Sequence, residues 1–123
     1  MKLKNILQIR KVIENHKQDK MATNLAYKFV KFLKASDKEE TFYDNQITLL
    51  FDEYSQKNED GTIKNDGQSI FIVPELIDEF NKKLAELQDT EVDKPEISFT
   101  LKELENLSFT VDEMYCLDEF IND

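Results

Sequence analysis

The sequence predicts an α+β protein that is mostly α-helical, with a long central helix, a short N-terminal helix, a small β-hairpin or three-stranded sheet, and C-terminal helices. Apolar residues recur at helical spacing over most of the chain, whereas turn signals gather in one middle stretch. Only two Gly and two Pro occur in 123 residues, which is typical of a helix-rich protein. A hydrophobic content of 40% is enough for one core, so we expect residues 1–123 to form a single domain.

The central helix is predicted by an apolar stripe between Met21 and Lys57. Steps of three and four residues place one set of side chains on a line with a polar gap in its middle: Ala22, Ala26, Phe29, Leu33, Ser36, Glu40, Tyr43, Ile47, Leu50 and Tyr54. Ser36 and Glu39 have the spacing of a capping box, which would start a second helix at the gap. Because the spacing continues in phase beyond the gap, we favour one long helix that can bend there.

A shorter amphipathic helix is predicted from about Lys2 to Lys17, with a basic outer face. Its apolar stripe is narrow and lacks aromatic anchors, which favours packing in the core over lying on a membrane. His16, near its end, is expected to be a solvated or capping residue. No second His exists in the sequence to complete a metal site.

The middle stretch carries the two glycines, in Asp60-Gly61 and Asp66-Gly67. A two-residue loop at Asp66-Gly67 would pair Asn65 with Gln68 and bring Ile63 opposite Ile70 in a hairpin. Alternation of Ile97 and Phe99 adds a third strand as an option. A surface hairpin fits this stretch better than an EF-hand calcium loop with Gly61 at its sixth position, because Gly67 would stand where the bidentate Glu is required.

Three further helices are predicted from capping signals. Pro74 suits the first turn of a helix that continues to about Gln88. Thr100 with Glu103 and Thr110 with Glu113 form two capping boxes, the first opening a short helix to Asn106 or Leu107 and the second opening a helix to about Ile121. The inward residues of this last helix are expected to be Val111, Met114, Leu117 and Ile121. Cys116 is expected to pack as a small apolar residue.

No motif for catalysis, a metal or a cofactor is present. The sequence lacks a glycine-rich phosphate loop, Cys-x-x-Cys, His-Glu-x-x-His and Gly-x-Ser-x-Gly. We therefore expect no enzyme and no cofactor. No apolar run approaches the ~18 residues of a membrane span, and the N-terminus lacks the apolar segment of a signal peptide, so we expect a cytoplasmic protein without membrane contact.

The two charge signs are unevenly distributed along the chain. Residues 1–38 contain ten Lys or Arg against three acidic residues, a net charge of +7, while the remainder has six basic and 23 acidic residues, a net charge of −17. This polarity serves solubility, or it steers a partner to an acidic face. The expected partner-binding residues are Glu39, Glu40, Asp44, Asp52 and Glu53. Direct nucleic-acid binding is not expected, because the molecule as a whole repels phosphate.

Several stretches in order resemble a family of short proteins from phages and prophages of Gram-positive bacteria, especially of streptococci. The matching stretches are Leu25-Ala26-Tyr27-Lys28, Asp52-Glu53-Tyr54-Ser55, Gly67-Gln68-Ser69-Ile70, Phe99 to Leu104 and Leu117 to Ile121. The resemblance implies a phage origin and a gene near those for tail and lysis proteins. It supplies no active site.

Two functions follow as hypotheses. The first is a non-enzymatic phage accessory protein that binds a host protein, such as an anti-CRISPR-like inhibitor or nucleic-acid mimic acting on a defence nuclease through its acidic surface. The alternative is a structural or assembly protein of the phage tail or virion; a trigger recognised by a host defence system is a further variant. The first places the protein in the cytoplasm of an infected or lysogenic bacterium, the second in the virion, and self-association is compatible with both.

Overall fold

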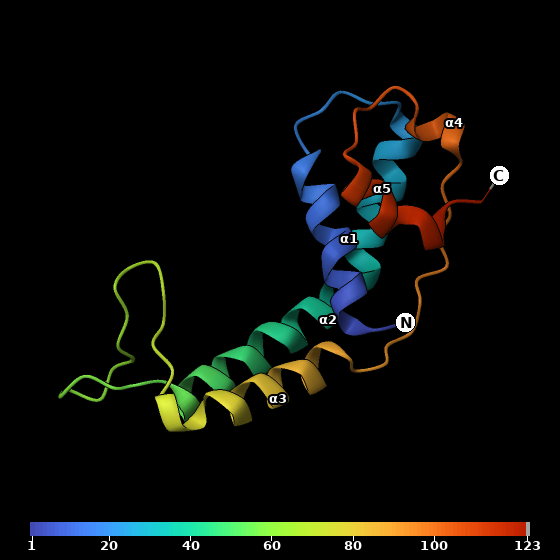
Figure 1. Ribbon diagram of the computed structural model, residues 1–123. Helices are drawn as coiled ribbons and strands as arrows, with labels where there is room; N and C mark the ends of the chain where they lie inside the picture. The colour runs from blue at the N-terminus through green and yellow to red at the C-terminus, as the bar shows by residue number, and fades with distance from the viewer. Residues whose placement is uncertain (123) are drawn as a thin grey trace. The chain divides into compact units, whose positions relative to one another are not determined.

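The computed structural model describes residues 1–122, and helices make up 61% of the chain. In order, the elements are α1 Leu3–Asn15, α2 Thr23–Tyr54, η1 Pro74–Leu76, α3 Ile77–Gln88, α4 Leu101–Leu104, α5 Val111–Leu117 and η2 Asp118–Phe120 (Figure 1). The chain divides into two compact units: the first holds Met1–Glu39 and Glu91–Asp123, and the second holds Glu40–Thr90. Helix α2 contributes residues to both.

Helix α2 confirms the prediction of one long helix. Its 32 residues run without a break through the polar gap, so Ser36 lies in mid-helix and caps nothing. The buried line in its first half differs from the predicted one, because Leu25 and Phe32 are buried while Ala22 is exposed. Burying a Phe or Leu removes more apolar surface from water than burying an Ala, and this decides the rotation of the helix.

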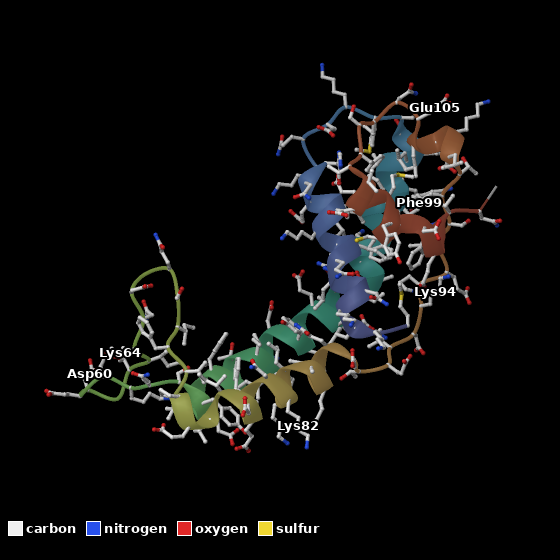
Figure 2. The ribbon with its side chains drawn as sticks, viewed as in Figure 1. Asp60, Lys64, Lys82, Lys94, Phe99 and Glu105 are labelled. Carbon is white, nitrogen blue, oxygen red and sulfur yellow. The ribbon has the colours of Figure 1, made fainter. Side chains whose placement is uncertain are left out.

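The core of the first unit combines α1 and α2 with the C-terminal segment. Helix α1, which confirms the predicted N-terminal helix, contributes Leu3, Ile6, Ile9, Val12 and Ile13. Phe99 meets Phe29 edge-on at 5.5 Å between ring centroids, and Phe120 meets Phe32 in the same way at 5.4 Å. Phe99 lies inside this unit in Figure 2. Each fully buried Phe stabilises the fold by roughly 1.5–3 kcal/mol, so these pairs anchor the C-terminal segment.

Both predicted capping boxes are present. Thr100 and Thr110 each accept the backbone N–H of the Glu three residues later, and each Glu side chain accepts the N–H of its Thr in return. Helix α4 is shorter than predicted, ending at Leu104, and the last helix ends in the turn η2. The inward placement of Val111 is wrong, because its side chain is 84% exposed. At about 100° per residue, Val111 lies about 120° around the helix from buried Leu117.

The second unit is built on the contact between α2 and α3. The ring of Phe80 stacks on Phe51 at 5.7 Å and meets Tyr54 at 6.0 Å. The Tyr54 hydroxyl donates a hydrogen bond to Glu79 Oε1 at 2.9 Å. The helix predicted from Pro74 to Gln88 is confirmed, with η1 as its first turn.

The predicted hairpin or three-stranded sheet is wrong. The described residues contain isolated bridges and no sheet, and Asn65 pairs with Ile70 in place of Gln68. The register differs because Asp66 Oδ1 accepts the N–H groups of Gln68 and Ser69 at 2.9 and 2.7 Å, which holds a four-residue loop from Asp66 to Ser69. Phe99 pairs with Ile121 in the first unit, so no third strand reaches this loop. The architecture is therefore helical.

Candidate interaction surface

The five predicted partner-binding residues lie in different environments. Glu39 is only 9% exposed, and its Oε2 atom has no hydrogen-bond partner among the described residues. Its Oε1 atom lies 3.8 Å from the Lys38 amine. Glu40 is half-buried and already interacts with another residue. The two residues nearest the polar gap are therefore not presented on the surface as free carboxylates.

Asp44, Asp52 and Glu53 are exposed on the part of α2 that belongs to the second unit. At about 100° per residue, Asp44 and Asp52 lie about 80° apart around the helix axis, whereas Glu53 lies about 180° from Asp44. Asp44 and Glu53 therefore flank the packed side of α2, marked by buried Tyr54, while Asp52 lies opposite it, so the three carboxylates spread over half of the helix circumference. Any face that uses them has to include acidic residues from other elements.

Those other residues come from α3 and the loops of the second unit. Residues 40–90 contain twelve acidic residues and four lysines, a net charge of −8. With Glu40 and Asp89 set aside, all the remaining carboxylates are exposed, and within the described residues none forms an ion pair. We call this set the acidic surface: Asp44, Asp52, Glu53, Glu59, Asp60, Asp66, Glu75, Asp78, Glu79 and Glu86.

The lysines of the second unit do little to neutralise the acidic surface. The Lys57 amine donates to the backbone carbonyls of Asp52 and Ser55. The Lys64 amine lies 5.7 Å from the centroid of the Phe71 ring, in cation–π geometry. Lys82 is exposed on α3 (Figure 2). The four lysines offset only four of the twelve acidic charges of residues 40–90, so the negative field of the unit stays largely uncompensated.

Two loop carboxylates of the acidic surface are held in place and kept ionised. Asp60 Oδ1 accepts the hydroxyl and the backbone N–H of Thr62 at 2.6 and 3.0 Å, and these bonds lower the pKa of Asp60. Hydrogen bonds from the backbone N–H groups of Ser69 and Gln68 lower the pKa of Asp66. Asp60 lies on the loop that follows α2 in Figure 2. Hydrogen bonds to the charged form favour it, so both groups stay ionised well below neutral pH.

The polar gap of α2 has a structural explanation in the first unit. Arg10 of α1 is only 8% exposed and reaches the gap with both of its terminal nitrogens. Its Nη1 atom donates to the Leu33 carbonyl and to Ser36 Oγ, each at 2.8 Å, and Nη2 donates to Asp37 Oδ1 at 3.0 Å. Ser36 Oγ donates in turn to the Phe32 carbonyl. The gap is therefore an internal polar contact between two helices.

His16 forms a second buried polar contact: of its two predicted roles, the solvated one is wrong and the capping one is confirmed. It occupies the C-cap of α1, with Nδ1 2.6 Å from Asp19 Oδ2 and Nε2 2.9 Å from Glu113 Oε2. The ring therefore lies between two carboxylates, one from its own connector and one from α5. The backbone N–H of Thr110 and the charge of His16 lower the pKa of Glu113.

Sequence reasoning missed most of the acidic surface and both buried contacts. The carboxylates of α3 are recognisable in the sequence only as charges that suit the start of a helix. Counting charges would not have singled out residues 40–90, because residues 91–123 also carry a net charge of −8, from two lysines and ten acidic residues. No local signal identifies the contact of Arg10 with Ser36 or of His16 with Glu113, because the partners lie 26 and 97 residues apart.

Other kinds of site find no support in residues 1–122. No group of three or more His, Cys, Asp or Glu side chains there is arranged to hold a metal ion. Cys116 is half-buried and packs against the core of the first unit. Among the helices of the described residues, none combines the length and the apolar character needed to cross a bilayer.

No protein-family model, curated protein or solved structure matches the chain. The resemblance to phage and prophage proteins therefore remains a prediction.

Proposed function

We propose that the chain is a non-enzymatic binding protein whose acidic surface occupies the nucleic-acid site of another protein. The observation that carries the proposal is the acidic surface, whose ten exposed carboxylates form no ion pair within the described residues. A groove that binds DNA or RNA presents Lys and Arg to phosphates. Carboxylates held at similar density meet the same cations and steer the encounter.

Preorganisation supports this role. Asp60 and Asp66 are fixed by hydrogen bonds within their own loops, and the α2–α3 contact fixes the helices that carry most of the other carboxylates. A surface that is ordered before binding loses less conformational entropy when the complex forms. The lowered pKa values of Asp60 and Asp66 keep the charges present over a wide pH range.

The resemblance to phage proteins directs the proposal to a partner in an infected or lysogenic bacterium. The partner is then a host protein with a basic nucleic-acid groove, such as a defence nuclease, which the acidic surface inhibits by competing with its substrate. Inhibition by this route requires only binding, with no cofactor and no catalysis by the chain itself.

Affinity purification with a matched pair of charge variants tests the proposal. The test variant carries Asp44→Asn, Asp52→Asn and Asp78→Asn in the acidic surface. The control variant carries Asp93→Asn, Glu96→Gln and Glu105→Gln, which are exposed carboxylates of the first unit, so both proteins change by the same three charges. We expect the wild type and the control to recover a nucleic-acid-binding protein from host cells, and the test variant to lose it.

Competition then identifies the surface of the partner. Added DNA or RNA should release the chain from the recovered protein, and the affinity should fall steeply as salt is raised. Recovery of no nucleic-acid-binding protein by the wild type would contradict the proposal. Equal losses in the test and control variants would show that net charge, and not the acidic surface, determines binding.

A further inference from the structure

The first unit contains a groove with an apolar floor and a basic rim. It lies between the end of α1, the connector after it and the first half of α2, and its volume of about 580 Å³ falls within the range of ligand and side-chain pockets. Its floor is formed by Ile13, Met21, Ala26, Phe29, Val30 and Leu33. Lys17 and Lys20 line the rim; Lys17 also forms an exposed ion pair with Glu14 at 3.3 Å, and the one acidic lining residue, Asp19, is bonded to His16. We call this feature the basic groove.

Helix α5 of the same unit presents the opposite combination. Val111 and Tyr115 are 84% and 85% exposed, although both have large apolar surfaces. Asp112 and Asp118 are exposed and lie within about 60° of Tyr115 around the helix axis, as does Val111. We call these four residues the acidic ridge. Tyr is one of the residue types enriched among the side chains that contribute most to binding at protein interfaces.

We propose that the first unit associates head to tail with a second copy of the chain, the acidic ridge of one copy occupying the basic groove of the next. The complementarity is twofold. Val111 and Tyr115 supply apolar side chains for the floor of the groove, and Asp112 and Asp118 meet the lysines on its rim. Both surfaces belong to one unit, so the fit does not depend on the second unit.

The two surfaces can be used at the same time. No residue of the C-terminal segment that carries the ridge lines the groove. An interface between two different surfaces of one chain is heterologous, and it continues into a ring or an open filament unless a free end is blocked. Association of this kind would display many copies of the second unit together, which raises the apparent affinity for a partner with several sites.

Complementary charge reversal tests the proposal directly. The groove variant carries Lys17→Glu and Lys20→Glu, and the ridge variant carries Asp112→Lys and Asp118→Lys. Sedimentation velocity and light scattering over a range of protein concentrations should show oligomers of the wild type that dissociate as salt is raised. In each variant, like charges meet across the interface, so we expect the dissociation constant to rise by about tenfold or more.

An equimolar mixture of the two variants should associate again, because the reversed groove then meets the reversed ridge and the native surfaces of the two proteins meet each other. The mixture also shows that the variants are folded, as does the circular dichroism of each alone. Lys11→Glu with Lys31→Glu, two exposed lysines of the same unit outside the groove, serves as the control and should associate like the wild type.

Three results would overturn the proposal. The first is a wild-type protein that remains monomeric at concentrations up to about 1 mM, since association with a dissociation constant above that value is too weak to support the proposal. The second is a mixture of folded variants that stays monomeric. The third is loss of association in the groove variant alone, which would mean that a different part of the chain occupies the groove. Because the acidic surface is intact in all these proteins, the outcome is independent of the proposed function.

Discussion

Replacing Arg10 with Met should destabilise the first unit, and the size of the effect follows from the atoms that Arg10 contacts. Met keeps an unbranched apolar stem in the buried site and removes the guanidinium. The bond from Arg10 Nη1 to Ser36 Oγ is 2.8 Å long and buried. A buried hydrogen bond from a charged donor contributes about 1.5–3 kcal/mol. The Asp37 carboxylate is 64% exposed, so that ion pair adds about 0–1 kcal/mol.

The desolvation of the buried guanidinium opposes these gains, so we expect Arg10→Met to lower the free energy of unfolding by about 2 kcal/mol. Ser36→Ala should lower it by about 1 kcal/mol, the usual contribution of one neutral group's hydrogen bond. Because the two side chains share a bond, the double variant should lose less than the sum of the single losses. The expected coupling energy is about 1–2 kcal/mol.

Urea denaturation followed by far-UV circular dichroism measures all four proteins of this cycle, with equal slopes as the check that only stability has changed. Lys11→Met is the matched control, since Lys11 is the exposed neighbour of Arg10, and it should change stability by less than about 0.5 kcal/mol. A coupling energy below about 0.5 kcal/mol would refute the reasoning. The polar gap would then be held by the apolar packing around it, with Arg10 as a bystander.

Two pH predictions follow from the shifted pKa values. The pKa of Glu113 is lowered from its ordinary value of 4.5, so its ionised form stabilises the fold above that pH and this stability is lost as the pH falls. Glu113→Gln keeps the hydrogen-bonding shape without the charge, so it should be less stable than the wild type at neutral pH and approach it in acid. A difference in urea midpoint that stays constant with pH would contradict this. The pKa of Tyr54 is raised from 10.0 to about 12 by its hydrogen bond to Glu79, by burial and by the charges of Glu53 and Glu79. Stability should then decline from about pH 10 upwards, and Tyr54→Phe should abolish the last step of the tyrosinate absorbance titration; an unchanged last step would assign it to another tyrosine.

The helices were predictable because their signals are local. A capping box uses residues three positions apart, and an apolar stripe repeats within every turn, so α1, α2, α3 and the starts of α4 and α5 could be derived from the sequence. The position of Val111 could not, because a seven-residue helix is too short for its period to fix which side faces the core. Val111, the first residue of α5, lies outside the buried stripe that contains Leu117 and Phe120.

The sheet was predicted from signals that are equally local but ambiguous. Asp66-Gly67 is compatible with a two-residue loop, yet the same Asp66 side chain can bond the backbone two and three residues ahead. That bonding enlarges the loop and changes the register. The alternation of Ile97 and Phe99 fits a strand, but burial of Phe99 against Phe29 places it in the core of the first unit.

The polar gap of α2 shows why the candidate surface could be predicted only in part. From the sequence, Ser36 to Glu40 marked either a bend or a contact with a partner, since both explain polar residues on an apolar stripe. The third explanation is a buried Arg from another helix. Arg10 does fall in the apolar stripe of its own helix, three residues before Ile13, but nothing near it in the sequence points to Ser36. Once Arg10 fills the gap, burial extends along α2 as far as Glu39. Of the five predicted residues, only Asp44, Asp52 and Glu53, which lie beyond this point, are exposed, and under the proposed function α3 and the loops of the second unit supply the remaining charge.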